Sequence, residues 1–432
     1  MTTWPVVITA KPIARASGTI SLPGSKSISN RALLLSALAD GRTVLAHLLD
    51  ADDTWVMRRA LSVLGIASVD GGDGLAITGQ HRLESRDASL HLGNSGTAFR
   101  LLTAALAFAG GRYVLQGVTR MHQRPIGDLV DALNGIGARI RYAANEGFPP
   151  LIIEPAHRIT ADVVAIRAGV SSQFLSGLLI AAPLIASPRG LKIVVEGSLI
   201  SEPYVALSIA MMGRFGVDVA RDGHTYSVPH SGYRSPGRFV VEGDASSASY
   251  FLALGAIAGG GPVTVYGVGR GSVQGDTRFA DALAQMGARI TWTDDSITSA
   301  APENARLKAI DLDCNHIPDA AMTLAIVALF ADGPSTLRNV GSWRVKETDR
   351  LSAMATELRK VGAEVDEGPD WIRITPPPKF REATIDTYDD HRMAMCFSLV
   401  AAGGVPVHIR NPGCVTKTFP EYFDRLADLV SR

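Results

Sequence analysis

The sequence predicts an α/β protein built from six copies of one unit of about 70 residues. Two recurring patterns support this prediction. Helices that end in an apolar residue followed by glycine recur at intervals of 71 to 79 residues, and helices of small apolar residues alternate with them. The chain has 432 residues, of which 46% are hydrophobic and 19% charged, as is typical of a globular protein with about two or three domains.

The first recurring element is an amphipathic helix that ends at a glycine. Examples are L-N-G-I-G-A-R-I at Leu133 and L-A-Q-M-G-A-R-I at Leu283. Glycine after the last apolar residue is a common helix stop, and the alternating run beyond it predicts a half-buried strand. The glycines are Gly65, Gly137, Gly216, Gly287 and Gly362, and a sixth copy of the helix, from Glu421, ends the chain.

The second recurring element is a helix of small apolar residues with a polar start. Helices with so few charges are normally buried on most sides. Most copies end close to a glycine before a strand such as G-R-T-V-L or G-L-K-I-V-V. Each unit is therefore predicted to hold a buried helix, a strand, a loop, an amphipathic helix and a strand pair. The polar starts lie near Ser27, Ser95, Ser171, Asp244, Asp319 and Asp390.

Charge and cysteine usage narrow the class of protein. The 42 basic and 42 acidic residues cancel, which argues against a broad surface for nucleic acid or an acidic membrane. Cys314, Cys396 and Cys414 form no C-x-x-C pair, as expected of a reduced compartment. The N-terminus lacks the pattern of a secretory signal, and no apolar run reaches the roughly 18 residues of a membrane span. We therefore expect a cytoplasmic protein.

Polar residues that do not look like ordinary surface occupy two positions of the unit. The N-terminus of a helix favours anions, and equivalent positions of stacked units lie on one face, so a ligand with more than one anionic group is expected. The starts of the buried helices carry Lys26, Ser27, Arg31, Asn94, Ser95, Thr97, Arg100, Ser171, Ser172, Gln173, Asp244, Ser246, Asp319, Asp390, His391 and Arg392. The loops after the next strand carry Asp52, Asp53, Arg124, Ser201, Tyr204, Gln274, Asp276, Lys346, Glu347, Arg350 and Lys417.

Purely structural roles remain open for several of these residues. Asp244 with Ser246 fits a helix cap, and residues 171–173 fit an imperfect capping box. His391 beside Arg392 fits a structural hydrogen-bonding pair. A purely structural explanation would have to apply to every one of these residues, and all of them lie at the same two positions of the unit. This coincidence favours a functional role for the set as a whole.

The chemistry that these residues favour is that of a small-molecule enzyme handling phosphate and carboxylate groups. No H-E-x-x-H motif, histidine cluster or D-x-D-x-D-G loop is present, so no metal or other cofactor is expected. Asp319 and Glu347 stand among cations at both functional positions of one unit, which makes them the candidates for proton transfer.

Specific motifs run along the chain from Leu22 to Phe423. They read P-G-S-K-S-I-S-N-R, L-G-N-S-G-T-A-F-R, R-P-I-G-D-L, S-S-Q-F-L-S, E-G-D-A-S-S-A-S-Y, N-H-I-P-D-A-A-M, W-R-V-K-E-T-D-R, D-D-H-R-M-A-M and T-K-T-F-P. Their sequence and order closely resemble the 5-enolpyruvylshikimate-3-phosphate synthase family. The resemblance implies transfer of the enolpyruvyl group of phosphoenolpyruvate to the 5-hydroxyl of shikimate 3-phosphate, with release of phosphate, in aromatic amino-acid biosynthesis.

The same resemblance implies the domain organisation. Two similar domains, each of three βαβαββ-type units with buried helices, would form an inside-out α/β barrel arrangement joined by a two-segment hinge. Residues 22–242 would form the domain that binds shikimate 3-phosphate. Residues 1–21 and 243–432 would form the other, which carries the acid and base and the phosphoenolpyruvate side. A monomer is expected.

The resemblance also implies roles for individual residues. Asp319 is similar to the base that takes the 5-hydroxyl proton, and Glu347 to the acid that protonates the enol methylene; Lys26 and Lys346 complete the catalytic set. Expected ligands of shikimate 3-phosphate are Arg31, Ser171, Ser172, Gln173, Ser201 and Tyr204. Expected contacts of phosphoenolpyruvate are Lys26, Gly96, Arg124, Arg350, Arg392 and Lys417. Ser27, Asn94, Thr97, Ser342 and His391 complete the substrate-binding set.

Three residues depart from the family pattern. Leu101 replaces a usual proline, which leaves open the sensitivity to glyphosate, the inhibitor that targets this family. Ser342 replaces a usual asparagine on the shikimate phosphate or hydroxyl side, and Glu202 replaces a basic or neutral residue. None is one of the expected acid and base residues.

Two alternative functions remain. The sister enzyme UDP-N-acetylglucosamine enolpyruvyl transferase is similar in fold and donor, but its usual cysteine is missing from the loop V-T-R-M-H-Q-R-P-I. A non-catalytic anion-binding relative would keep the fold without turnover. Phosphate release with each acceptor distinguishes the three.

Overall fold

The computed structural model describes residues 4–81, 83–156, 159–303 and 306–431. Residues 1–3, with which the predicted segment 1–21 begins, and residue 432 lie outside the described residues. The chain divides into two compact units. Gly24–Val241 form one, called the central unit here, and Met1–Pro23 with Glu242–Arg432 form the other, called the terminal unit.

The central unit contains three four-stranded sheets of the same topology. In each, the first two strands pair in parallel and the remaining strands pair antiparallel. The sheets are β17 (Arg238–Val240), β5 (Arg42–Ala46), β7 (Gly74–Thr78) and β6 (Ala67–Gly71); β8 (Ala88–His91), β9 (Tyr113–Gln116), β11 (Leu151–Glu154) and β10 (Arg139–Tyr142); and β12 (Val163–Ala168), β13 (Leu191–Leu199), β15 (Thr225–Val228) and β14 (Ala220–Asp222).

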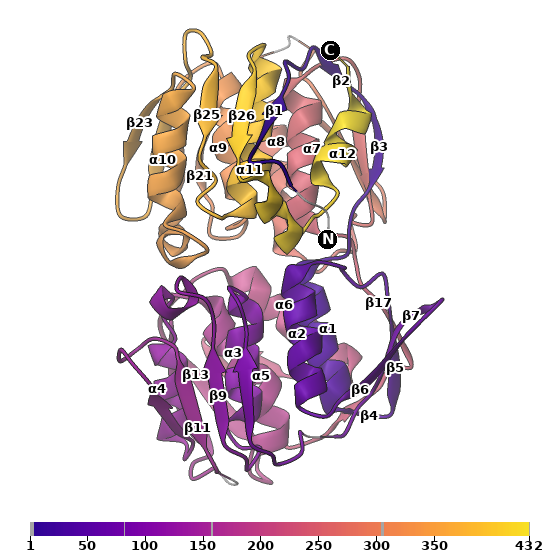
Figure 1. Ribbon diagram of the computed structural model, residues 1–432, viewed down its shortest axis with the longest axis vertical. Helices are drawn as coiled ribbons and strands as arrows, with labels where there is room; N and C mark the ends of the chain where they lie inside the picture. Colours follow the sequence, from indigo (N-terminus) through magenta and orange to yellow (C-terminus); the bar gives the residue numbers. More distant parts are fainter. Residues whose placement is uncertain (1–3, 82, 157–158, 304–305, 432) are drawn as a thin grey trace. The chain divides into compact units, whose positions relative to one another are not determined.

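Buried helices form the core of the central unit, and the sheets lie outside them (Figure 1). They are α1 (Lys26–Leu38), α3 (Gly96–Leu106) and α5 (Ser172–Ile185), in which nearly every residue is buried, as their low content of charged residues predicts. The amphipathic helices are α2 (Asp52–Val63), α4 (Gly127–Gly135) and α6 (Glu202–Arg214).

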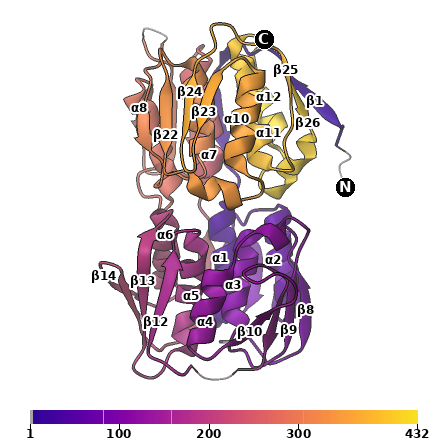
Figure 2. The same cartoon turned by 90° about the vertical axis from the view of Figure 1, so that its left-hand side faces the viewer.

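The terminal unit repeats this plan (Figure 2). Its two four-stranded sheets are β3 (Gly18–Ser21), β18 (Val263–Tyr266), β20 (Ser296–Ala300) and β19 (Arg289–Trp292), and β21 (Asp311–Asp313), β22 (Ser335–Arg338), β24 (Ile372–Thr375) and β23 (Glu364–Glu367). Its buried helices are α7 (Ala245–Ile257), α9 (Ala321–Val327) and α11 (His391–Ser398), and the outer helices are α8 (Phe279–Gln285), α10 (Arg350–Lys360) and α12 (Tyr422–Leu429). The predicted fold class is confirmed.

The sixth repeat lacks the strand pair that follows the other amphipathic helices. As predicted, the sixth copy of that helix, α12, is the last helix of the described chain, and only the short strand β27 (Val430–Ser431) follows it. The N-terminus supplies the missing strand: β1 (Val7–Ala10) pairs antiparallel with β26 (Val407–Arg410), which pairs in parallel with β25 (Ala383–Ile385). The unpaired edge of β26 is thereby satisfied by a strand that is distant in sequence.

The chain crosses between the two units twice, and at each crossing a strand pairs within its own unit before the chain continues into a helix of the other unit. β3 leads directly into α1 of the central unit but pairs with β18 of the terminal unit. β17 leads into α7 of the terminal unit but pairs with β5 of the central unit. A Cβ atom at Gly24 would lie 2.2 Å from the His47 carbonyl oxygen, so this position requires glycine.

The predicted helix boundaries are confirmed at their ends and adjusted at two starts. The five stop glycines all have positive φ, between +83° and +106°, as expected of helix C-terminal glycines. The first buried helix begins at Lys26 with Ser25 as its N-cap, not at Ser27, and α9 begins at Ala321, two residues after Asp319. Within the described residues, every helix is too short or too polar to cross a membrane.

Candidate active site

Asp319 is the centre of a charged cluster in the terminal unit. Its Oδ1 atom lies 3.2 Å from Nη1 of Arg350 and 3.6 Å from Nζ of Lys346, and its Oδ2 atom lies 3.0 Å from Nη2 of Arg392. The residue is 8% exposed. Three cations therefore hold one nearly buried carboxylate, and at this burial their attraction is only weakly screened.

Arg350 links this carboxylate to two others. Its Nε and Nη2 donate to both oxygens of Asp390 at 2.6 and 3.1 Å, and Nη2 lies 2.9 Å from Glu347. Burial lowers the pKa of Arg350, but Asp390, Glu347 and Asp319 outweigh it and raise this pKa above its ordinary value. The guanidinium of Arg350, for which the resemblance implies a contact with phosphoenolpyruvate, thus also contacts the expected acid and base.

The N-terminus of α11 positions the third cation. Asp390 is its N-cap and accepts the amide of Arg392 at 2.9 Å, while Nη1 of Arg392 donates to the hydroxyl of Tyr250 at 3.1 Å. His391 is fully buried, and its Nδ1 atom lies 3.5 Å from Asp390. Sequence reasoning missed Tyr250, although it ends the motif E-G-D-A-S-S-A-S-Y.

Asp276 lies beside this cluster on the short helix Gly275–Arg278 and contacts the hydroxyl of Ser246. Burial, followed by the negative charge of Asp319, raises the pKa of Asp276 to about 6, against the attraction of Arg392. Asp244 caps α7 by accepting the amide of Ser247 at 2.7 Å. The structure therefore shows the helix cap that was the alternative role for Asp244.

Replacing Asp276 by Asn is expected to stabilise the protein at pH 8 more than at pH 4. The folded carboxyl keeps its proton up to about pH 6, whereas an unfolded one loses it near pH 3.8, so its stabilising contribution is lost as the pH rises through 6. Asp276→Asn should therefore raise the free energy of unfolding by about 2–3 kcal/mol at pH 8. Thermal unfolding at both pH values tests this, with the half-exposed Asp281→Asn as control. An equal shift at both pH values would contradict it.

Arg31 is a buried charged residue of the central unit, as Asp319 is of the terminal unit. It is 1% exposed, and its guanidinium donates to the hydroxyls of Ser208 (2.8 Å) and Ser176 (3.4 Å) and to the carbonyl of Ser27 (3.0 Å). No carboxylate among the described residues pairs with it, and burial lowers the pKa of Arg31 to about 10. A buried cation without a counter-ion is costly unless an anionic ligand approaches it.

A second pair of arginines lies at the start of α3. Arg124 is 3% exposed, donates to the carbonyl and side-chain oxygens of Asn94 at 2.9 and 3.1 Å, and has no carboxylate partner among the described residues. Arg100 donates to the carbonyls of Gly96 and Pro125. A Cβ atom at Gly96 would lie 2.5 Å from guanidinium nitrogens of both arginines. Only glycine allows this approach.

The remaining candidates of the central unit lie at helix starts. Gln173 donates to Thr97 at 3.2 Å, which joins α5 to α3. Ser171 caps α5 by accepting the amide of Gln173, so it matches its capping alternative, and Ser172 is buried beside it. Ser201 precedes α6 with a left-handed backbone, φ 54°, and the carbonyl of Tyr204 lies 3.5 Å from Nη2 of Arg31.

The other predicted residues have separate positions. Lys26 lies 3.8 Å from Asp53, and Ser27 follows it on the first turn of α1. In the terminal unit, Ser342 lies buried on the short helix Gly341–Val345, its hydroxyl without a partner among the described residues. Lys417 ends the short helix Pro412–Lys417. Glu202, one of the departures, pairs with Arg221.

Ser176 and Ser208 were not predicted as site residues. Each is a polar residue in an otherwise apolar stretch of a buried helix face, which is the signal that could have identified them. Ser208 also donates to the carbonyl of Tyr204 at 2.8 Å and lies 3.0 Å from Ser176.

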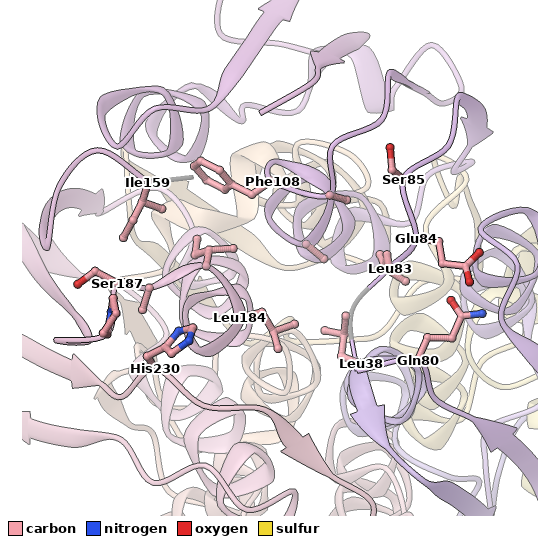
Figure 3. A pocket seen from close by; sticks show the side chains of 15 residues that line it. Leu38, Gln80, Leu83, Glu84, Ser85, Phe108, Ile159, Leu184, Ser187 and His230 are labelled. Atoms are coloured by element: carbon pink, nitrogen blue, oxygen red, sulfur yellow. The ribbon is translucent and has the colours of Figure 1, made fainter. Parts of the chain in front are cut away.

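A cavity of about 840 Å³ lies at the other ends of the same central-unit helices (Figure 3). Leu38, Phe108 and Leu184, from the C-terminal ends of α1, α3 and α5 or just beyond, contribute to its lining. In Figure 3, Gln80 and Glu84 lie on one side and Ser187 and His230 on the other. No predicted site residue lines it, so it is separate from the candidate active site. Across the described part of the chain, no group of three or more His, Cys, Asp or Glu residues is arranged to hold a metal ion.

The repeated units, with buried helices inside four-stranded sheets, form the fold of a known enolpyruvyl transferase. The enolpyruvyl transferase NikO from Streptomyces tendae has this fold, with a TM-score of 0.75, 18% identity, and coverage of 98% of this chain and 97% of NikO. The family model of EPSP synthase (3-phosphoshikimate 1-carboxyvinyltransferase) matches residues 10–426, and the chain belongs to this family.

Similar proteins carry the same description. The 3-phosphoshikimate 1-carboxyvinyltransferase of Thiobacillus denitrificans is 62% identical over 424 residues, which covers 96% of this chain and 98% of the relative. The one from Burkholderia lata is 59% identical over 427 residues, with 97% and 98% coverage. Among solved structures, the EPSP synthase of Acinetobacter baumannii has a TM-score of 0.80, 26% identity and 98% coverage of both chains.

Proposed function

We propose that this chain transfers the enolpyruvyl group of phosphoenolpyruvate to the 5-hydroxyl of shikimate 3-phosphate and releases phosphate, as a 3-phosphoshikimate 1-carboxyvinyltransferase of the shikimate pathway. Membership of the EPSP synthase family supports this activity. The structural observation that carries it is the Asp319 carboxylate, held at 3.0 to 3.6 Å by Arg392, Arg350 and Lys346 and joined through Arg350 to Glu347.

Glu347 and Asp319 divide the proton transfers. Glu347 donates a proton to the methylene carbon of phosphoenolpyruvate, and the resulting oxocarbenium-like carbon is attacked by the 5-hydroxyl. Asp319, assisted by Lys346, accepts the hydroxyl proton. The tetrahedral intermediate then loses phosphate, and the ionised Glu347 takes back a proton from the methyl group, which gives the enol ether. Fixed cations such as Arg392 and Lys417 stabilise the charge of the departing phosphate without reorganising.

The central unit supplies the anion-binding side. Arg31 binds the carboxylate of shikimate 3-phosphate, because it is a buried cation that no described carboxylate neutralises. Ser171, Ser172 and Ser201 bind its phosphate. Gln173 and Tyr204 contact the ring side. Lys26, Arg124 and Gly96 belong to the phosphoenolpyruvate side, where the missing side chain of Gly96 lets Arg100 and Arg124 lie against the start of α3.

The remaining substrate-binding residues support these contacts. Ser27 contacts Arg31 and Thr97 contacts Gln173, both of the shikimate 3-phosphate set, and Asn94 contacts Arg124 of the phosphoenolpyruvate set. Ser342 and His391 complete the substrate-binding set in the terminal unit. We further propose that the protein acts as a monomer in the cytoplasm, as a biosynthetic enzyme with buried, unpaired cysteines.

A phosphate-release assay with two acceptors tests the proposed function. Purified protein with phosphoenolpyruvate should release phosphate with shikimate 3-phosphate and not with UDP-N-acetylglucosamine. Release only with the nucleotide sugar would identify the sister activity. Binding of shikimate 3-phosphate by calorimetry without release in either assay would identify a non-catalytic relative.

A further inference from the structure

Glu357 is a buried carboxylate that the proposed reaction does not use. It lies on α10, its side chain has no exposed surface, and three groups of the described chain contact it. Oε1 accepts the hydroxyl of Tyr388 at 2.7 Å, and Oε2 accepts the amide of Asp386 at 3.2 Å and lies 2.7 Å from Nζ of Lys360. Burying a carboxylate costs desolvation free energy, so we infer that the hydrogen bonds of Glu357 support a particular local structure.

That local structure is the 386–390 segment between β25 and α11. Tyr388 and Asp389 both have left-handed backbones, with φ of 53° and 56°. For residues other than glycine this conformation costs on the order of 1–2 kcal/mol each, and two in succession persist only when surrounding contacts hold them. The hydroxyl of Tyr388 and the amide of Asp386 are held by one carboxylate, that of Glu357.

The segment is held on both sides. On one side, α10 carries Arg350 and Glu357, seven residues and two turns apart and hence on one face, and both contact this segment. On the other side, Asp386 accepts Nη1 of Arg410 at 2.6 Å. Thr387 donates to the carbonyl of Arg410 at 3.0 Å.

The held segment ends in the charged cluster. The amide of Asp390 donates to the carbonyl of Thr387 at 2.8 Å, so the left-handed pair determines where Asp390 lies. Asp390 accepts the amide of Arg392 and two donors of Arg350, and Arg392 in turn contacts Asp319. A chain of hydrogen bonds thus joins Glu357 to the expected base.

We propose that Glu357 is a positioning residue: through the hydroxyl of Tyr388 and the amide of Asp386 it holds the left-handed 386–390 segment so that Asp390 and Arg392 keep their places beside Asp319. The catalytic consequence rests on the proposed function. Loss of this hold shifts Arg392, a cation for phosphoenolpyruvate, and leaves the central unit that binds shikimate 3-phosphate unchanged.

Tyr388→Phe is the mildest test because it removes one hydroxyl and leaves Glu357 with two partners. The KM for phosphoenolpyruvate should rise about 10-fold, as expected for loss of a hydrogen bond to a charged group, while the Kd for shikimate 3-phosphate changes less than about 2-fold. Glu357→Gln, which also removes the charge facing Lys360, should have at least the same effect.

Tyr233→Phe is the matched control. It removes a fully buried tyrosine hydroxyl that donates to the carbonyl of Ile180 at 2.8 Å in the central unit, so it reports the effect of losing such a bond elsewhere. It should leave the KM for phosphoenolpyruvate unchanged. Adding Asp389→Gly to Tyr388→Phe should bring the raised KM for phosphoenolpyruvate most of the way back to the wild-type value, because glycine adopts the left-handed backbone without strain.

Amide hydrogen exchange separates this proposal from the proposed function. The amides of Asp390 and Arg392 should exchange faster in Tyr388→Phe than in the wild type, whether or not the protein turns over shikimate 3-phosphate. Absent turnover of the wild type would refute the function, and faster exchange would still support the hold on the segment. Unchanged exchange and KM in folded Tyr388→Phe and Glu357→Gln, or an equal loss of affinity for both substrates, would overturn it.

Discussion

Asp319→Asn is expected to lower kcat by about 10² to 10⁴-fold, the range for loss of a positioned general base. The amide has nearly the same shape but cannot accept the proton of the 5-hydroxyl. It also leaves Arg350, Arg392 and Lys346 without the carboxylate that they share at 3.0 to 3.6 Å. Steady-state phosphate release measures kcat, and calorimetry measures binding of shikimate 3-phosphate, which should stay within about 3-fold because Arg31 and its partners are in the central unit.

Asp311→Asn is the control for this variant. Asp311 forms an exposed bidentate pair with Arg338, both contacts at 2.7 Å, on β21 of the same terminal unit. An exposed pair contributes little, so kcat should not change. Wild-type turnover by Asp319→Asn would remove Asp319 from the proton transfer, and a parallel loss in the control would indicate general damage to the terminal unit.

Arg31→Met is expected to raise the Kd for shikimate 3-phosphate by at least about 100-fold, since truncating one side of a buried charge pair typically costs 2–5 kcal/mol. Without ligand, the same variant should be as stable as the wild type or more stable. Burial lowers the pKa of Arg31 from 12.5 to about 10, which corresponds to about 3 kcal/mol against the charged form. Ser176 and Ser208 keep their bond to each other when the guanidinium is removed.

The two results together test the role of Arg31. Calorimetry with shikimate 3-phosphate and thermal unfolding without ligand give the two quantities, and Arg141→Met, at a half-exposed arginine paired with Glu154, is the control. A less stable ligand-free Arg31→Met protein with unchanged affinity would show that Arg31 is a structural residue.

Local patterns were enough to predict the repeated elements. The glycines that end the helices could be predicted because a helix that ends in a left-handed residue strongly prefers glycine there. All five of these glycines, the first being Gly65 and the last Gly362, adopt that conformation. The burial of α1 and α5 could be predicted because these helices contain few charged residues that would favour contact with water. Both signals involve residues within one turn or one helix.

Long-range pairing was not predictable in the same way. The strand that completes the sixth repeat, β1, pairs with β26 about 400 residues later in the sequence, and nothing in the four residues Val7–Ala10 specifies that partner. Strand pairing depends on which edge is left open, and an open edge exists only once the sheet has formed.

The same distinction between local patterns and long-range contacts applies to the candidate site. By itself, the sequence determined the six repeats, the buried helices with polar starts, and the residue types at those starts, because these depend on propensities and spacings within one segment. Only the tertiary structure decided that Arg350 holds Asp390, Glu347 and Asp319, that Arg31 is a buried cation without a carboxylate partner in the described chain, and that Glu357 holds the 386–390 segment. Those contacts join residues from separate helices and loops, and the free energy of a charge depends on its burial and neighbours, which exist only after the segments have packed.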